Sequence, residues 1–234
     1  MRSKITAKVL EIFSSRQGEG LYPGVRQIFI RFSGCNLACL FCDVPAETNY
    51  QTRIFSPAGL RDEVERRMRK SGPYHSLSLT GGEPLLQVEF LKEFLPQVKK
   101  IKIYLDTNGT LPEEFKKVSS RIDYVSLDFK LPSSTGRDAL WESHRRFLKL
   151  AGRKSCFVKA VITGKTTRED LKKAVGIIAG IDKNIPLILQ PVTAVDNFRA
   201  PVSGKQLLDF QKYALKKLSE VRIIPQLHKR MGLR

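Results

Sequence analysis

The sequence predicts an α/β fold, a partial, open β/α barrel with a parallel sheet and helices on its outside. Strand-like apolar runs alternate with longer helix-like runs through the middle and C-terminal parts of the chain, an order typical of a parallel sheet covered by helices. The chain has 234 residues, whereas a complete eightfold barrel usually takes about 250. No linker rich in Pro, Gly or Ser divides it, so we expect a single domain over residues 1–234.

The predicted strands are short runs rich in apolar and β-branched residues. In chain order they cover residues 5–13, 27–32, 77–80, 101–106, 124–128, 156–162, 186–190 and 221–224. The predicted helices are longer runs with a 3.6-residue apolar period, over residues 57–69, 87–98, 112–118, 138–150, 168–179 and 204–218. Proline just inside the helix marks two starts, at Ser56-Pro57 and Leu111-Pro112. Thr167 is a suitable N-cap for the helix that follows it.

The composition is strongly basic, with a formal net charge of +18. This charge admits two interpretations, a nucleic-acid-binding face or a solvated, Lys-rich surface. We favour the surface, because the basic residues are scattered in pairs and aromatic residues do not alternate with them. A basic protein still favours anionic small substrates. No apolar run approaches the ~18 residues that span a bilayer, and the N-terminus lacks a signal-peptide core, so we expect a cytoplasmic protein.

Three of the four cysteines, Cys35, Cys39 and Cys42, lie within eight residues, in the spacing C-x3-C-x2-C after a predicted strand. Three thiolates on one loop can hold three irons of a cubane cluster, which leaves the fourth iron open to a small chelating molecule. A structural zinc site would need a fourth ligand nearby, and buried, inert cysteines remain the other alternative. Phe41 could shield a cluster, and Cys156 has the surroundings of a core residue.

Polar motifs follow several predicted strands. Thr80-Gly81-Gly82-Glu83-Pro84 comes after one strand; its glycines would let the backbone approach a ligand, and Glu83 could accept from a ligand ammonium. The same motif could be an ordinary strand-to-helix turn. Asn108, Asp128, Lys130 and Gln190 lie at later strand ends. Because ligands bind at the carboxyl ends of parallel strands, these residues predict one shared pocket, although each could be a turn residue.

The C-x3-C-x2-C motif, preceded by Gly34 and with Phe41 before its last cysteine, resembles the signature of the radical S-adenosylmethionine superfamily. The resemblance implies that superfamily's open barrel and a [4Fe-4S] cluster on Cys35, Cys39 and Cys42. It also implies S-adenosyl-L-methionine as cosubstrate, from which a 5′-deoxyadenosyl radical is made. The cofactor-binding residues would be Phe41, Cys42, Asp43, Gly81, Gly82, Glu83, Asn108, Asp128, Lys130 and Gln190.

The segment Ser15-Arg16-Gln17-Gly18-Glu19-Gly20, with Arg31 and the C-terminal Pro225-Gln226-Leu227-His228-Lys229, resembles the 7-carboxy-7-deazaguanine synthase family of queuosine biosynthesis. The resemblance implies a carbon–nitrogen lyase that contracts the ring of 6-carboxy-5,6,7,8-tetrahydropterin with loss of ammonia. Gln17 and Glu19 would contact the pterin edge and Arg31 the carboxylate, although Arg31 could also point outward. Substrate contacts are expected from Arg16, Gln17, Gly18, Glu19, Arg31, Thr80 and His228, unless the C-terminus is a flexible tail.

Two positions depart from that family's pattern. Val44 stands where a hydroxyl residue often helps to hold Mg²⁺, and valine offers no oxygen ligand, so magnesium dependence is in doubt. Asp128-Phe129-Lys130 replaces a common Ser-Pro-Lys and resembles glycyl-radical-activating enzymes. Such an activase, or another radical S-adenosylmethionine enzyme with a different substrate, is the alternative function. A zinc or nucleic-acid module is the third. The family resemblance further suggests a homodimer and a flavodoxin or ferredoxin as reductant.

Overall fold

The computed structural model describes residues 5–43, 52–152, 154–194 and 198–233. Within them the chain forms a nine-stranded sheet in the order β3-β1-β2-β4-β5-β6-β7-β8-β9. The strands are β1 (Ala7–Arg16), β2 (Arg26–Phe32), β3 (Arg53–Phe55), β4 (Ser76–Gly81), β5 (Lys102–Thr107), β6 (Tyr124–Asp128), β7 (Ser155–Ile162), β8 (Leu187–Pro191) and β9 (Val221–Ile223). The sheet is open, because β3 and β9 form its two edges.

Pairing is parallel from β2 through β9, whereas β1 pairs antiparallel with both β2 and β3. The connection explains the difference: only a short loop joins β1 to β2, and parallel neighbours need a long crossover. The predicted parallel sheet is therefore confirmed for the barrel itself, with an antiparallel addition at its N-terminal edge.

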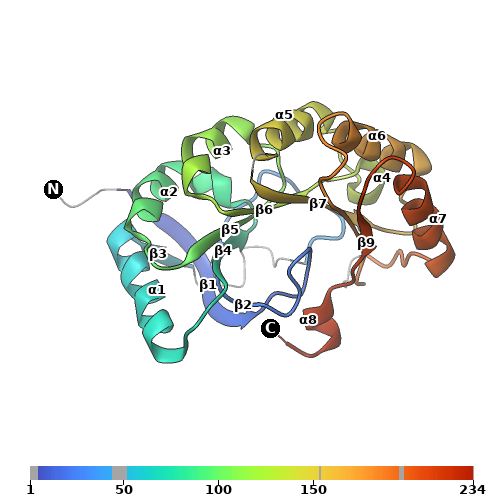
Figure 1. Cartoon of the computed structure of the whole chain (residues 1–234). Coiled ribbons are helices and arrows are strands. Elements are labelled where there is room, and N and C mark those ends of the chain that lie inside the picture. Colours follow the sequence, from blue (N-terminus) through green and yellow to red (C-terminus); the bar gives the residue numbers. More distant parts are fainter. Residues whose placement is uncertain (1–4, 44–51, 153, 195–197, 234) are drawn as a thin grey trace.

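The helices are α1 (Pro57–Ser71), α2 (Val88–Phe94), α3 (Pro112–Val118), α4 (Pro132–Thr135), α5 (Trp141–Ala151), α6 (Arg168–Ala179), α7 (Gly204–Ala214) and α8 (Leu227–Arg230), with short 3₁₀ turns η2 (Pro84–Gln87), η3 (Leu95–Gln97) and η4 (Ser119–Arg121). Figure 1 shows α1, α2, α3, α5, α6 and α7 following one another along the outer side of the curved sheet. No described helix is long and apolar enough to cross a membrane.

Several of these helices begin with a residue whose side chain accepts a hydrogen bond from a backbone amide of the first turn. Ser56 Oγ accepts from the Gly59 amide at 3.2 Å, and Thr167 Oγ1 accepts from the Asp170 amide at 3.2 Å. Such caps satisfy backbone donors that the helix itself cannot pair. The helix start predicted at Ser56-Pro57 and the cap predicted at Thr167 are thus confirmed.

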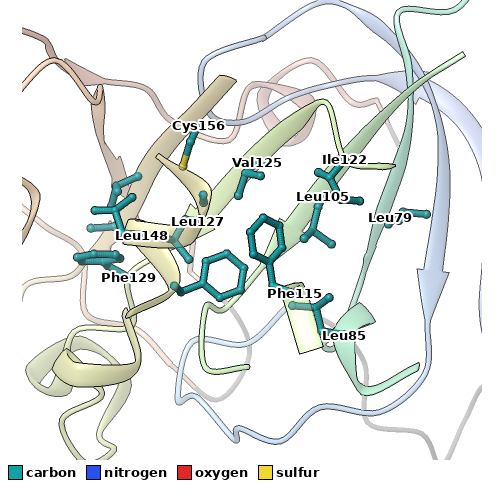
Figure 2. Close-up of a cluster of buried hydrophobic side chains, with 14 of the residues drawn as sticks. Leu79, Leu85, Leu105, Phe115, Ile122, Val125, Leu127, Phe129, Leu148 and Cys156 are labelled. Carbon is teal, nitrogen blue, oxygen red and sulfur yellow. The ribbon is translucent and has the colours of Figure 1, made fainter. Parts of the chain in front are cut away.

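The main hydrophobic core lies between the sheet and its outer helices. Residues that alternate along each strand point outward, so Leu105 of β5, Val125 and Leu127 of β6 and Val158 of β7 are all buried in one cluster. Phe115 of α3 lies close to Leu105 in this cluster (Figure 2). Cys156 belongs to the same cluster, as expected for a core residue.

The inner face of the sheet differs along its length. Toward the amino ends of the strands, Tyr104, Phe157 and Ile188 form a second buried cluster, on which Tyr22 packs. Gly20 adopts φ +68, and a Cβ there would lie 2.4 Å from the Phe157 ring; glycine alone accommodates both conditions. The loop after β1 thus fills one end of the barrel and leaves polar side chains at the other.

Several elements differ from the predicted ones. The helix expected over residues 87–98 is divided among the end of η2, α2 and η3. The α-helix ends before Pro96, because proline lacks the amide that would continue it. The helix expected from residue 138 begins at Trp141, and the one expected to reach residue 218 ends at Ala214. The short elements β3, α4 and α8 were not predicted, since three or four residues carry no readable period.

Candidate functional site

A pocket lies at the carboxyl ends of the parallel strands, where such folds bind ligands. It brings together almost every residue that the sequence nominated. The predicted residues that line it are Arg16, Gln17, Gly18, Glu19, Arg31, Cys35, Cys39, Phe41, Cys42, Asp43, Thr80, Gly81, Gly82, Asn108, Asp128, Lys130, Gln190 and His228. Glu83 is the exception. Val44 lies outside the described residues.

The cysteine loop follows β2 and is held by backbone contacts. The Leu40 amide donates to the Thr135 carbonyl at 3.1 Å, and the Cys42 amide donates to the Cys39 carbonyl at 3.1 Å. No disulfide joins these cysteines, all of which are described. Burial raises the pKa of the Cys35 and Cys39 thiols, and the nearby Lys130 ammonium opposes that rise.

Gly81 and Gly82 lie directly against the cysteine loop. A Cβ on Gly81 would lie 2.2 Å from the Phe32 carbonyl oxygen, and one on Gly82 would lie 2.1 Å from the Gly34 carbonyl oxygen. The Glu83 amide donates to that same Gly34 carbonyl at 2.8 Å. Glycine is therefore needed here for the close approach of two backbones, which positions the first cysteine.

The structure corrects the expectation for Glu83. Its side chain is fully buried behind the pocket and accepts from the Leu85 amide at 3.0 Å, Thr107 Oγ1 at 2.9 Å and the Asn108 amide at 2.8 Å. Burial raises the pKa of its carboxyl to about 7, although those hydrogen bonds favour the charged form. Glu83 thus joins β4 to the loop after β5 and presents no oxygen to a ligand ammonium.

The residues present fit an iron–sulfur cluster with a bound cosubstrate. The three cysteines of one loop open onto one pocket, and the side-chain nitrogen Nδ2 of Asn108 lies 3.8 Å from Cys35 Sγ. Among the described residues, no three His, Cys, Asp or Glu side chains gather closely enough to hold a single metal ion. A cubane instead takes each cysteine on a different iron, so its cysteines are spread apart.

Two pocket-lining side chains offer buried acceptors for a ligand. Asp128 Oδ1 and Gln190 Oε1 have no hydrogen-bond partner within the described residues. Buried acceptors are normally paired, so an unpaired one in a pocket indicates a ligand donor. Both residues were predicted to bind cofactor.

A charged cluster occupies the pocket floor. Lys159 Nζ lies 2.6 Å from Glu19 Oε2, 3.5 Å from Asp128 Oδ2 and 3.9 Å from Asp106 Oδ1, while Lys130 Nζ donates to Asp128 Oδ2 at 2.8 Å. Burial alone would raise the pKa of Glu19, but the Lys159 ammonium lowers it to about 2. Burial also raises the pKa of Asp106, against the opposing effect of Lys159.

The C-terminal segment closes one side of the pocket. Gln226 Nε2 donates to Glu19 Oε1 at 2.6 Å and to Asp43 Oδ2 at 3.1 Å, and Lys229 also pairs with Asp43. The Leu227 amide donates to the Gly18 carbonyl at 2.9 Å. The flexible-tail alternative is therefore wrong for these residues.

Arg31 also faces the pocket, which excludes the outward alternative. Its Nε donates to Glu11 Oε1 at 2.7 Å, and its guanidinium carbon lies 5.9 Å from the centre of the Phe13 ring. The Arg31 side chain is one-quarter exposed, so it is held in place while remaining accessible to an anion.

The sequence interpretation missed Lys159 and Gln226. The one available signal for Lys159 was a charged residue inside the apolar run of β7, since buried lysine is rare unless paired. Gln226 lay within the C-terminal segment that resembles the synthase family, but nothing in the sequence linked it to Glu19. Its partner Glu19 lies 207 residues away, and only the fold brings them together.

Comparisons with known proteins agree with this site. A family model described as the radical SAM superfamily matches residues 29–181. The chain is 40% identical to a 7-carboxy-7-deazaguanine synthase of Geobacter sulfurreducens, covering 98% of this chain and 99% of the relative, and 33% identical to one of Archaeoglobus fulgidus, covering 97% and 99%.

Solved structures show the same fold. The crystal structure of QueE from Escherichia coli matches with a TM-score of 0.63 at 20% identity and covers 95% of both chains. A radical SAM methyltransferase from Sphaerobacter thermophilus matches with a TM-score of 0.64 at 15% identity, covering 88% of this chain and 67% of that one. With its cysteine loop, its open barrel and its full-length relatives, the chain belongs to the radical SAM superfamily and, within it, to the 7-carboxy-7-deazaguanine synthase family.

Proposed function

We propose that this protein converts 6-carboxy-5,6,7,8-tetrahydropterin to 7-carboxy-7-deazaguanine with loss of ammonia. The observation that carries the proposal is that one pocket holds both the cysteine loop and the residues Gln17, Glu19 and Arg31. The first set is common to radical enzymes, whereas the second set lies in the part of the chain that resembles the synthase family. The relatives that share this full length are named for the same activity.

Cys35, Cys39 and Cys42 would hold the [4Fe-4S] cluster, and S-adenosyl-L-methionine bound beside it would supply a deoxyadenosyl radical that removes hydrogen from the substrate. The close packing at Gly81 and Gly82 places their backbone next to the cluster loop. Asp128 and Gln190 offer the unpaired acceptors described above, and we assign them, with Asn108 and Lys130, to cosubstrate binding.

Glu19 and Arg31 have the charges that the substrate requires. Glu19 is held ionised, since its pKa is lowered to about 2 despite burial, so it accepts from ring N–H groups. Arg31 is a permanent cation with a planar fork suited to a carboxylate. The Gln17 side chain is held next to Glu19: its Oε1 accepts from the backbone amides of Gly18 and Glu19 at 2.9 and 3.0 Å.

For magnesium we propose that position 44 contributes no side-chain ligand, because valine has no oxygen. The neighbouring carboxylate, Asp43, is already paired with Lys229 and Gln226. Turnover should therefore respond weakly to Mg²⁺. Titration of MgCl₂ into metal-free assay buffer tests this, and an absolute requirement would contradict it.

We also propose a cytoplasmic homodimer reduced by an acidic flavodoxin or ferredoxin. The net charge of +18 would attract such a partner. Light scattering at several protein concentrations tests the dimer. Electron transfer that does not slow with added salt would contradict the electrostatic attraction.

The decisive experiment is product formation by anaerobically reconstituted protein with dithionite, S-adenosyl-L-methionine and carboxytetrahydropterin. We expect 7-carboxy-7-deazaguanine, identified by mass spectrometry, and ammonia in equal amounts. Loss of ammonia from this substrate needs no net reduction, so 5′-deoxyadenosine need not accumulate with the product. Cleavage of S-adenosyl-L-methionine without the deazaguanine acid would overturn the proposal. A glycyl-radical signal on a partner polypeptide would instead support the activase alternative suggested by Asp128-Phe129-Lys130.

A further inference from the structure

Lys159 lies on the pocket floor and is absent from the roles assigned above. It belongs to β7, where Phe157, Lys159 and Val161 face the inside of the sheet and their neighbours face the outer helices. Its side chain is only 6% exposed. In the sheet register Lys159 is directly opposite Asp128 of β6, so the two side chains emerge on the same face.

Three carboxyl groups from three parts of the chain converge on this ammonium. Glu19 comes from the loop between β1 and β2, Asp106 from β5 and Asp128 from β6. The shortest contact, 2.6 Å, is the one to Glu19, which is 140 residues away. A buried ammonium is costly unless it is paired and hydrogen-bonded, and this one has its best partner in Glu19.

The other charged groups near Glu19 cannot replace Lys159. Lys130 pairs with Asp128, and Lys229 pairs with Asp43. His228 is half-buried and lies against Gly18, and burial lowers the pKa of its imidazole. Without Lys159, Glu19 would share a buried space with Asp106 and Asp128. Among the described residues its carboxylate would keep only the neutral Gln226 amide as a hydrogen-bond partner, a setting in which like charges and burial disfavour ionisation.

We infer that Lys159 is a positioning residue that fixes the Glu19 carboxylate on the pocket floor and keeps it in the form that accepts from a heterocycle N–H. Lys159 holds Oε2 and Gln226 holds Oε1. Each carboxylate oxygen has a second acceptor position, which leaves Glu19 able to receive substrate donors in a fixed orientation. This inference rests on the proposed function, in which Glu19 contacts the pterin ring.

The test compares Lys159→Met, which keeps the length of the side chain without its charge, with wild type and with Lys159→Arg. We expect Lys159→Met to raise KM for carboxytetrahydropterin at least about tenfold. Lys159→Arg should recover part of the loss. Lys102→Met is the matched control, because it removes a lysine from an exposed pair with Asp123 at the opposite end of β5, and should leave KM unchanged.

The pH dependence separates an electrostatic role from simple packing. With Lys159 present, Glu19 stays ionised across the assay range. In Lys159→Met we expect KM to rise as the pH falls toward 5, because Glu19 then takes up a proton. This rise in KM at low pH should vanish in the double variant Lys159→Met/Glu19→Gln. Asp106, Asp128, Lys130, Asp43, Lys229 and His228 line the same pocket as Glu19, so the double variant is needed to assign this pH dependence to Glu19.

A double-mutant cycle with Glu19→Gln completes the test. If Lys159 acts through Glu19, the two losses in KM are not additive; additive losses, or an unchanged KM in Lys159→Met, would overturn the inference. Should Lys159→Met not fold, Lys159→Gln takes its place, and circular dichroism checks each variant. If wild type itself neither binds nor converts the pterin while S-adenosyl-L-methionine is cleaved, the proposed function has failed rather than the role of Lys159.

Discussion

The two sides of the pocket are built in different ways. The cluster side, made of Cys35, Cys39, Cys42, Gly81 and Gly82, consists of two short motifs at the ends of adjacent strands β2 and β4. The Glu19 side, made of Glu19, Asp43, Lys159, Gln226 and Lys229, joins separate segments, two of them 207 residues apart. The first side depends on backbone geometry and the second on buried charge.

This difference has consequences for how each side fails. A Cβ added to Gly81 or Gly82 would lie only 2.2 or 2.1 Å from a carbonyl oxygen of the neighbouring backbone. Substitutions on the cluster side should therefore have nearly all-or-none effects. A charge network instead redistributes its protons and hydrogen bonds when one member is lost. Changes on the Glu19 side should therefore be graded and dependent on pH.

The largest effect is expected from Cys39→Ala. A cluster held by three cysteines has no spare protein ligand, so this variant should retain almost no iron or sulfide after anaerobic reconstitution. Cys156→Ala is the control, because Cys156 is buried in the outer core, and it should keep wild-type iron content. Equal iron content in Cys39→Ala and wild type would show that Cys39 does not hold the cluster.

Gly82→Ala should be nearly as damaging. The new Cβ would lie 2.1 Å from the Gly34 carbonyl oxygen and 2.9 Å from Cys35 Cβ, so the cysteine loop must move. We expect reduced iron content and weaker S-adenosyl-L-methionine binding, measured by equilibrium dialysis. In the control, Gly176→Ala in α6, the Cβ meets nothing within 4 Å, and the helix should gain roughly 0.5–1 kcal/mol. Normal cluster loading in Gly82→Ala would contradict the close-approach argument.

Arg31→Lys tests the Glu19 side with a graded change. Lysine keeps the charge but loses the planar fork, so KM for carboxytetrahydropterin should rise about tenfold. This corresponds to a loss of about 1.4 kcal/mol in binding free energy. Cleavage of S-adenosyl-L-methionine without substrate should not change. Arg66→Lys, on the exposed face of α1, serves as control. An unaltered KM in Arg31→Lys would remove Arg31 from carboxylate binding.

The smallest effect is expected on the free energy of unfolding, through His144, which lies behind the cluster side of the pocket. His144 is buried, stacks on Phe129 with ring centres 4.5 Å apart, and its Nε2 lies 3.0 Å from the Asn108 carbonyl. Burial lowers its pKa from 6.5 to about 4. The imidazole is therefore neutral in both states above pH 6.5, but between pH 6.5 and 4 the unfolded chain takes up the proton first, so stability falls.

This loss should amount to about 1 kcal/mol between pH 7.5 and 5.5, measured by urea unfolding. His144→Gln should be less stable than wild type at pH 7.5, yet show a flatter dependence on pH. His75→Gln, at a partly exposed histidine, is the control for general histidine titration. An identical pH slope in wild type and His144→Gln would refute the assignment.

Much of the fold could be predicted where elements are long or strongly marked. The bounds of β6, α3 and α6 agree with the predicted residues 124–128, 112–118 and 168–179, since turn signals and prolines border them. The antiparallel placement of β1 could not be predicted. Apolar alternation identifies a strand, but it does not say which neighbour the strand pairs with.

The sequence by itself determined the cysteine spacing, the glycines that let two backbones touch, and the polar residues at strand ends. These features were readable because each depends on residues close together in the chain. Only the tertiary structure decided that Glu83 turns away from the pocket and that Lys159 and Gln226 hold Glu19. The direction of a side chain and its distant partners follow from packing between strands, which no local spacing records.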